Sequence, residues 1–190
     1  MSETVLQTGG RGFFGRRIAE ALTAHGYEVV APGRPEFDLL DYATVERVMK
    51  RVRPHTVVHS AAYYGGLGIC VAEPARIFHD NTLMTVNLLE ALPKGSVKRF
   101  VSVGSACAYP GNVNGDMREE DFWAGALHPS VEAYGFMKKI QQVGAHAFDP
   151  FGIGDRAPVQ AVKRVTTKIT IGGSNAADVG HDHDALRRGA

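Results

Sequence analysis

A glycine-rich turn near the N-terminus restricts the fold of this chain more than any other sequence feature. Residues 4–8 form a short apolar segment, the stretch GGRGFFG follows at residues 9–15, and a helix-like run continues from it. A second short apolar segment, residues 28–31, completes the pattern. A strand that turns through glycines into a helix and then into another strand predicts a βαβ unit, in which the two strands are parallel.

The same alternation continues to about residue 148. Asp41 is a good cap for a helix whose valines recur at helical spacing, and Pro54 ends that helix. Ser130 is expected to cap the last helix, and the glycine-rich residues 61–74 are expected to form a loop. The predicted strands are residues 4–8, 28–31, 56–60 and 99–103, and the predicted helices are residues 14–24, 43–52, 77–92 and 131–148. This order predicts an α/β fold, a Rossmann-type doubly wound parallel sheet with helices on both faces.

Charge and length exclude several classes of function. With 21 basic and 20 acidic residues and no basic run, the 190-residue chain is not expected to bind nucleic acid. No apolar run is long enough to cross a membrane, and the N-terminus lacks a signal-peptide pattern. We therefore expect a cytoplasmic protein without a membrane partner, whose two cysteines, Cys70 and Cys107, are reduced.

The glycine turn has the chemistry of a dinucleotide site. Gly9, Gly12 and Gly15 are spaced so that the backbone can approach a pyrophosphate, whose charge would lie at the N-terminus of the following helix. A tight turn without a ligand is the alternative interpretation. The strand–turn–helix context favours binding.

The end of the second strand discriminates between the two nicotinamide dinucleotides. NAD-binding versions place an acidic residue there to hold the ribose hydroxyl, but this strand continues as VVAPGRPEFD with no acid at its tip. Arg34 here and Arg11 in the turn suit a 2′-phosphate, although either one alone is nearly as well explained as a solvated surface arginine. We therefore expect NADP(H), with NAD(H) as the alternative, and we expect Asp38 beside Leu39 to close over the adenine. The predicted coenzyme contacts are Gly9, Gly10, Arg11, Gly12, Phe13, Phe14, Gly15, Arg34, Asp38, Leu39, Ala61, Ala62, Tyr134 and Lys138.

A tyrosine and a lysine on the last predicted helix form a candidate catalytic pair. Tyr134 and Lys138 are four residues apart, which puts both side chains on one helix face. An ammonium beside a phenol is expected to lower the phenol pKa from its usual ~10, so that the tyrosine exchanges a proton with a carbonyl or alcohol oxygen. Ser105, at the end of the preceding strand, would add a hydrogen bond to that oxygen. Such a pair is common on ordinary helices, and the dinucleotide turn upstream is what makes it a specific signal.

Together these residues resemble the extended short-chain dehydrogenase/reductase (NAD-dependent epimerase/dehydratase) family, and the resemblance covers about residues 5–148. Within the family the chain is most similar to the GDP-L-fucose synthases, on the segments GGRGFFG, GRPEFDLLD, AAYYGG, EPARIFHDN, GSACAYP and residues 133–138. The resemblance implies an NADPH-dependent 3,5-epimerase/4-reductase of a nucleotide sugar. It also implies a homodimer, in which the Tyr134 helix commonly supplies the interface.

The resemblance assigns a chemical role to the cysteine in VSVGSACAYP. Ser105 and Tyr134 would serve hydride transfer and hold the developing oxyanion, and a Cys107 thiolate would remove a proton next to the sugar ketone. The alternative for Cys107 is an inert buried thiol. A family asparagine matches Asn81, which either steadies the site or caps its helix. The implied catalytic residues are Ser105, Cys107, Tyr134 and Lys138, and the implied substrate contacts are Ser105, Cys107 and Asn81.

The C-terminal part departs from the family pattern. We expect residues 1–165 to form the NADP(H)-binding domain and residues 166–190 to form a divergent, poorly ordered tail. Further strand signals occur near residues 158–162 and 166–173. The substrate-binding C-terminal domain of the family would then be largely missing. His181 and His183 are faint candidates for the second acid/base of epimerisation, and we predict no metal site there. Another NAD(P)-dependent nucleotide-sugar epimerase/dehydratase and a non-catalytic dinucleotide-binding remnant stay open as alternatives.

Overall fold

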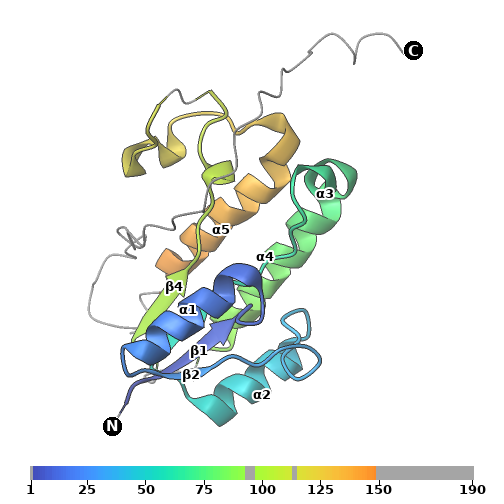
Figure 1. The fold of residues 1–190 in the computed structure, drawn as a ribbon. Coiled ribbons are helices and arrows are strands. Elements are labelled where there is room, and N and C mark those ends of the chain that lie inside the picture. Colours follow the sequence, from blue (N-terminus) through green and yellow to red (C-terminus); the bar gives the residue numbers. More distant parts are fainter. Residues whose placement is uncertain (1, 93–96, 113–114, 149–190) are drawn as a thin grey trace, which may run out of the picture.

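The computed structural model describes residues 2–92, 97–112 and 115–148 (Figure 1). Strands alternate with helices as predicted, and short 3₁₀ turns occupy the connection between the last strand and the last helix. The strands are β1 (Thr4–Thr8), β2 (Glu28–Val30), β3 (Thr56–His59) and β4 (Arg99–Ser102). The α-helices are α1 (Phe13–Ala24), α2 (Tyr42–Val52), α3 (Leu67–Ala72), α4 (Pro74–Glu90) and α5 (Glu132–Phe148), and the 3₁₀ turns are η1 (Ala106–Ala108), η2 (Glu119–Trp123) and η3 (Pro129–Val131).

The four strands form one parallel sheet in the order β2-β1-β3-β4. In the central pair Leu6 lies opposite Val57, and in the next pair Val57 lies opposite Phe100. Parallel strands need crossover connections, and α1, α2 and α4 supply them here. The predicted Rossmann-type fold is confirmed.

The main core lies between the sheet and the helices α2 and α4. Because strand side chains alternate between faces, Leu6, Val57 and Phe100 point to the same side, where they pack with Val48 of α2 and Leu88 of α4. Helix α1 connects β1 to β2 across the opposite face, in front of the sheet in Figure 1. Burial of apolar side chains in such a core stabilises a domain by roughly 25 cal/mol per Å² of apolar surface removed from water.

Two local predictions are wrong. Residues 67–72, expected in a loop, form helix α3, which is held by the burial of Cys70 against Ile77 of α4. Ser130 does not cap the last helix, because residues 129–131 form the turn η3 and the ring of His128 accepts a hydrogen bond from the backbone N–H of Ser130 at 3.3 Å. Helix α5 then continues from this turn.

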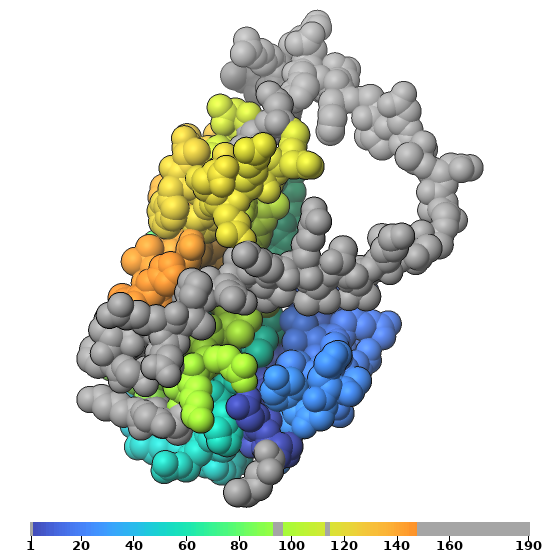
Figure 2. All heavy atoms as spheres, turned by 90° about the vertical axis from the view of Figure 1, so that its left-hand side faces the viewer, coloured from blue at the N-terminus to red at the C-terminus, as the bar shows by residue number. Residues whose placement is uncertain are grey.

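The connection from β4 to α5 extends the molecule beyond the carboxyl end of β4. In Figure 2 this segment (yellow) forms a bulge above α5 (orange) and away from the glycine turn (blue). The predicted strands at residues 158–162 and 166–173, the domain boundary at residue 165 and the C-terminal tail lie outside the described residues. No helix within the described ranges is long and apolar enough to span a bilayer.

Candidate active site

The predicted site residues come from loops or turns that meet at the carboxyl edge of the sheet, from the first turn of α1, or from α5 and α4 beside it. The chain leaves β1 toward β2 on one side and leaves β3 toward β4 on the other, so the carboxyl ends of β1 and β3 flank a topological switch point. Crevices at such points are where open α/β sheets bind ligands. Gly9, just after β1, lies so close to the residue after Ser60 that an added Cβ would be 2.7 Å from the backbone nitrogen of Ala61.

The glycine turn is shaped by backbone contacts that no side chain would fit. Gly9 has a φ of +68°, which glycine adopts at low cost. A Cβ on Gly15 would lie 2.0 Å from the carbonyl oxygen of Gly9, so α1 begins directly against the turn. No side chain caps the N-terminus of α1 at Gly12, and its first turn holds no acidic residue. These features suit an anionic group at this helix end.

A cleft of about 340 Å³ opens between the glycine turn and the loops after β2 and β3. It includes most of the predicted coenzyme contacts and adds Phe37, Tyr63 and Met84. The side chains of Phe13 and Phe14 are 84% and 55% exposed, and they are not part of its lining. The lining residues are Thr8, Gly9, Gly10, Arg11, Gly12, Pro32, Gly33, Arg34, Phe37, Leu39, Ala61, Ala62, Tyr63 and Met84.

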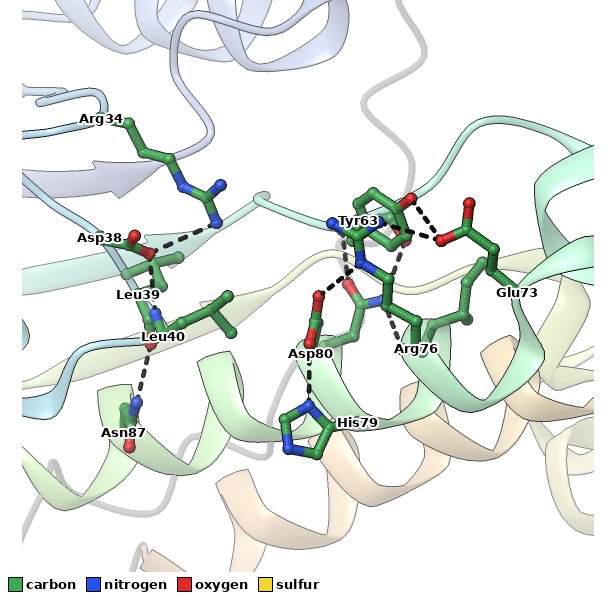
Figure 3. A network of polar contacts seen from close by, with 12 residues as sticks. Arg34, Asp38, Leu39, Leu40, Tyr63, Glu73, Arg76, His79, Asp80 and Asn87 are labelled. Carbon is green, nitrogen blue, oxygen red and sulfur yellow. Dashed lines mark hydrogen bonds and ion pairs between the residues drawn. The ribbon is translucent and has the colours of Figure 1, made fainter.

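The two predicted phosphate-binding arginines lie at one end of this cleft. The side chain of Arg11 covers Gly33 so closely that a Cβ there would be 2.8 Å from the guanidinium carbon of Arg11. Arg34 pairs with Asp38 at 3.4 Å between Nη2 and Oδ1 (Figure 3). Asp38 also accepts a hydrogen bond from Leu40 N at 3.1 Å and is not part of the cleft lining, and its position over an adenine stays a prediction. Its neighbour Leu39 does line the cleft.

Asn81 holds the loop after β3 and does not start its helix. Its Oδ1 accepts from the backbone N–H of Tyr63 at 2.7 Å, and its Nδ2 donates to the carbonyls of Tyr63 (3.0 Å) and Ile77 (2.7 Å). The side chain is buried, with all three of these partners on the backbone. Asn81 is therefore placed to fix Tyr63, which is one of the lining residues of the coenzyme cleft.

Tyr63 is also held by Glu73, the residue just before α4, and by Arg76 of α4 (Figure 3). Its hydroxyl donates to Glu73 at 3.0 Å, and the guanidinium of Arg76 lies 4.3 Å from its ring centroid. Arg76 in turn bonds Glu73 and Asp80. The hydrogen bonds to Asn81 and Glu73 hold one tyrosine between the cleft and the second cluster described next.

The second cluster brings the predicted catalytic residues together. Cys107 of η1 packs against the buried cluster that contains Tyr134 of α5, and Ser105 caps η1 by accepting from the backbone N–H of Cys107 at 3.2 Å. Gly135 makes this approach possible, because a Cβ there would lie 2.2 Å from the carbonyl oxygen of Cys107. Buried Cys70 belongs to the same cluster. The structure therefore places a hydroxyl, a thiol and a phenol near the end of β4.

Lys138 does not lower the pKa of Tyr134, and that expectation is wrong. Burial, with the Cys107 thiol nearby, raises the pKa of Tyr134 to about 12. The Lys138 ammonium lies 5.7 Å from the Tyr134 ring centroid and donates instead to the carbonyl of Val103 (2.7 Å) and to Gln141 Oε1 (3.0 Å). Burial also lowers the pKa of Lys138 to about 8. Tyr134 is therefore a proton donor at neutral pH.

Two further side chains of the cluster were not predicted as site residues. The ring of Tyr64 lies 4.5 Å from that of Tyr134, centroid to centroid, and Tyr64 remains partly exposed at the edge of the cluster. Burial and the Cys107 thiol raise its pKa. Gln141, about one turn after Lys138 and two turns after Tyr134, is fully buried. The doubled tyrosine in AAYYGG and a glutamine on the apolar face of a helix are the sequence signals that could have indicated them. His181 and His183 lie outside the described residues.

Comparisons with known proteins find one family and several relatives that this chain is similar to. A family model described as "NAD dependent epimerase/dehydratase family" matches residues 5–149. A GDP-L-fucose synthase of Azorhizobium caulinodans is 31% identical over 136 residues, which are 72% of this chain and 44% of that protein. A GDP-mannose 3,5-epimerase 1 of Oryza sativa subsp. indica is 30% identical over 164 residues, which cover 77% of this chain and 43% of that protein.

A solved structure of a related protein is also similar to this chain. The GDP-L-fucose synthetase of Naegleria fowleri, in a crystal structure bound to NADP, superposes with a TM-score of 0.68 at 25% identity, over 78% of this chain and 44% of that one. The chain thus spans less than half the length of each of these three relatives. The family model, by contrast, covers all of the described sheet except Thr4, and the whole of the candidate site. This chain belongs to the NAD-dependent epimerase/dehydratase family.

Proposed function

We propose that this chain carries the coenzyme and catalytic half of an NADP(H)-dependent GDP-sugar 3,5-epimerase/4-reductase of the GDP-L-fucose synthase type. The observation that supports this most strongly is that Cys107 packs against the buried cluster that holds Tyr134, beside Ser105, and that Tyr63 belongs to both this cluster and the lining of the glycine-turn cleft. A simple dehydrogenase needs the phenol and the serine only, whereas a thiol at the same point adds a base for carbon acids. The similarity to GDP-L-fucose synthase and GDP-mannose 3,5-epimerase supports a GDP-sugar substrate.

The coenzyme end of the site fits NADP(H) better than NAD(H). The glycine turn and the N-terminus of α1 suit the pyrophosphate, and Arg11 and Arg34 suit a 2′-phosphate. A carboxylate that would hold a ribose hydroxyl is not among the lining residues of the cleft; the nearby Asp38 is paired with Arg34. When bound, the coenzyme would supply the hydride that reduces the 4-keto group.

The side chains of this chain would handle the protons. A thiolate at Cys107 would take a proton from the carbon next to the ketone, and the electron pair of the broken C–H bond would move to the ketone oxygen as an enolate. A second acid would then return a proton to the opposite face of that carbon, which restores the ketone with inverted configuration before it is reduced. Ser105 and Tyr134 would hydrogen-bond that oxygen. Tyr134, protonated at neutral pH because its pKa is raised to about 12, would later give its proton to the C4 oxygen as the hydride arrives at C4.

The experiment is a titration of the chain with NADPH and NADH, followed by incubation with NADPH and GDP-4-keto-6-deoxymannose. We expect tighter binding of NADPH and consumption of NADPH with the keto sugar. Tyr134→Phe should abolish NADPH oxidation and keep coenzyme binding, and Cys107→Ser should slow solvent-deuterium exchange at C3 and C5. Coenzyme binding without turnover would instead support a non-catalytic dinucleotide-binding protein, and wild-type exchange in Cys107→Ser would remove the role given to the thiol.

A second candidate is a GDP-sugar 3,5-epimerase without net reduction, which the similarity to the rice epimerase favours. It uses the same cluster of Cys107 and Tyr134. The two candidates differ in coenzyme balance, because a reductase consumes one NADPH for each sugar and an epimerase consumes none. Exchange of sugar protons with NADPH left unoxidised would support this second candidate.

A further inference from the structure

Lys138 is a buried cation whose hydrogen-bond partners are neutral. Its side chain is 5% exposed, and its Nζ donates to the carbonyl oxygen of Val103 and to Oε1 of Gln141. Within the part of the chain that the structure describes, Gln141 is the one side chain that accepts a hydrogen bond from this ammonium. The direction in which the ammonium points is therefore set by one backbone carbonyl and one glutamine.

We propose that Gln141 is a positioning residue for Lys138, which holds the ammonium at the carboxyl end of β4 in a charged and correctly aimed state. The catalytic consequence rests on the proposed function, while the positioning itself does not. A carboxylate in place of the glutamine would pair with the ammonium and stabilise its charge. An apolar residue would leave one backbone acceptor only and would destabilise the charge.

The environment of Lys138 leaves Gln141 as the group that can be changed with a clear result. From β3, His59 faces the ammonium, and the two are coupled electrostatically; burial and the Lys138 charge lower the pKa of His59 to about 3, so the ring is neutral near pH 7. On α5 itself the titratable neighbours are Tyr134, against whose cluster Cys107 of η1 packs, and the buried Lys139, whose ammonium lies over the rings of Phe122 and Trp123. From α4, Thr85 bonds His59 and does not titrate. The charged groups of α4 and β4 are directed elsewhere: Arg76 and His79 each pair with Asp80, Arg99 pairs with Glu3, and Glu90 is exposed at the end of α4.

The other end of the Gln141 side chain argues against a purely structural role. The residue is 1% exposed, and its Nε2 is buried without a hydrogen-bond partner among the described residues. A buried amide nitrogen without a partner lowers stability, and a leucine of similar size would avoid that cost. The bond from Lys138 to Oε1 is the interaction that accounts for a glutamine at this position.

Direct titration of Lys138 tests the proposal without substrate or coenzyme. The full-length chain is labelled with ¹³C-lysine, Lys138 is assigned from the Lys138→Met variant, and its midpoint is followed by NMR. We expect Gln141→Glu to raise the midpoint by about 1 to 3 pH units, and Gln141→Leu to lower it. The matched control is Ala147→Glu, which puts the same carboxylate at an exposed position of α5, nine residues after Lys138 and on the opposite face of the helix. An unchanged midpoint in both Gln141 variants would overturn the proposal, and if Gln141→Glu does not fold, Gln141→Leu decides alone.

Activity assays then separate this inference from the proposed function. In the NADPH-oxidation assay, the alkaline limb of the rate–pH profile should move with the Lys138 midpoint, upward for Gln141→Glu and downward for Gln141→Leu. If the alkaline limb of the rate–pH profile stays in place while the NMR midpoint of Lys138 moves, the proposed effect of Gln141 on catalysis is contradicted. A wild-type chain that shows no turnover would contradict the proposed function and leave the NMR result as the test of positioning.

Discussion

At the scale of single residues, Gly135 is the clearest case of a position where the site leaves no room for a side chain. A glycine inside a helix costs ~1 kcal/mol relative to alanine, so this position is unexplained by helix propensity. The structure supplies the reason, because a Cβ would lie 2.2 Å from the carbonyl oxygen of Cys107 and 2.8 Å from Cδ1 of Leu127. We predict that Gly135→Ala lowers the free energy of unfolding by about 1–3 kcal/mol, measured by urea denaturation, and slows turnover by displacing η1.

Gly144 provides the matched control on the same helix. A Cβ there would meet only Cδ1 of Leu89, at 2.8 Å, the movable end of a side chain. Gly144→Ala should therefore cost much less than Gly135→Ala, because the gain in helix propensity of up to ~1 kcal/mol offsets the repacking. Equal losses in the two variants would show that the Cys107 backbone is not what requires a glycine.

His59 gives a second prediction at this scale. The ring is 2% exposed, bonds Thr8 at 2.8 Å and Thr85 at 3.4 Å, and has its pKa lowered from 6.5 to about 3 by burial and by the Lys138 charge. Between pH 6.5 and 3 the unfolded state therefore binds more protons than the folded state, so stability falls as the pH falls through this window. At pH 5 the loss should be about 2 kcal/mol. Urea melts of His59→Gln should show a shallower decline than the wild type, and parallel declines would contradict a neutral buried ring.

At the scale of elements, the glycine turn and α1 act as one unit. A Cβ on Gly15 would lie 2.0 Å from the Gly9 carbonyl oxygen, but one on Gly12 would lie 3.2 Å from it. We predict that Gly15→Ala lowers the free energy of unfolding by more than about 2 kcal/mol, whereas Gly12→Ala changes it by less than about 1 kcal/mol. Fluorescence titration should show weaker NADPH binding in both variants. If Gly12→Ala binds as well as the wild type, the backbone there does not approach the coenzyme.

Element order was predictable from the sequence because each strand and long helix has its own local signal. The four strands and the helices α1, α2, α4 and α5 agree with the predicted segments to within a few residues. Helix α3 was not predictable in this way, because six residues starting after Gly66 have too few internal hydrogen bonds to form a stable helix alone. Its stability comes from Ile69 and Cys70 packing against α4 and α5, which is a tertiary effect.

The candidate site likewise has features with a local sequence signal and features that depend on tertiary packing. The glycine turn, Arg11 and Arg34 could be placed from the sequence because their motif fixes a local conformation next to a strand end. The pKa of Tyr134 could not, because it depends on burial and on where the Lys138 ammonium points. That direction is set by Val103 and Gln141, and no spacing rule for a tyrosine and a lysine contains it.

At the scale of the whole molecule, α4 and α5 pack on each other and leave apolar side chains on their outer surfaces. Phe136 and Val143 of α5 are 47% and 53% exposed, with the half-buried Ile140 between them. The spacing i, i+4, i+7 makes this a continuous stripe along α5, and Phe78 and Val86 are exposed on the neighbouring α4. Exposed apolar patches of this kind mark interaction surfaces. We propose that the stripe is the homodimer interface that the family resemblance implies.

The proposed dimer is tested by charge substitution on the stripe. We predict that the wild-type chain sediments as a dimer of twice 20.5 kDa and that Phe136→Glu shifts it to the monomer, because each of two symmetry-related copies would bury an unpaired carboxylate at the interface. Met117→Glu is the matched control, since Met117 is similarly exposed (48%) but lies on the β4–α5 connection away from the stripe. Analytical ultracentrifugation from low to high micromolar concentration gives the answer. A wild-type monomer throughout that range would remove the dimer, and a Phe136→Glu dimer as tight as the wild type would place the interface on another face.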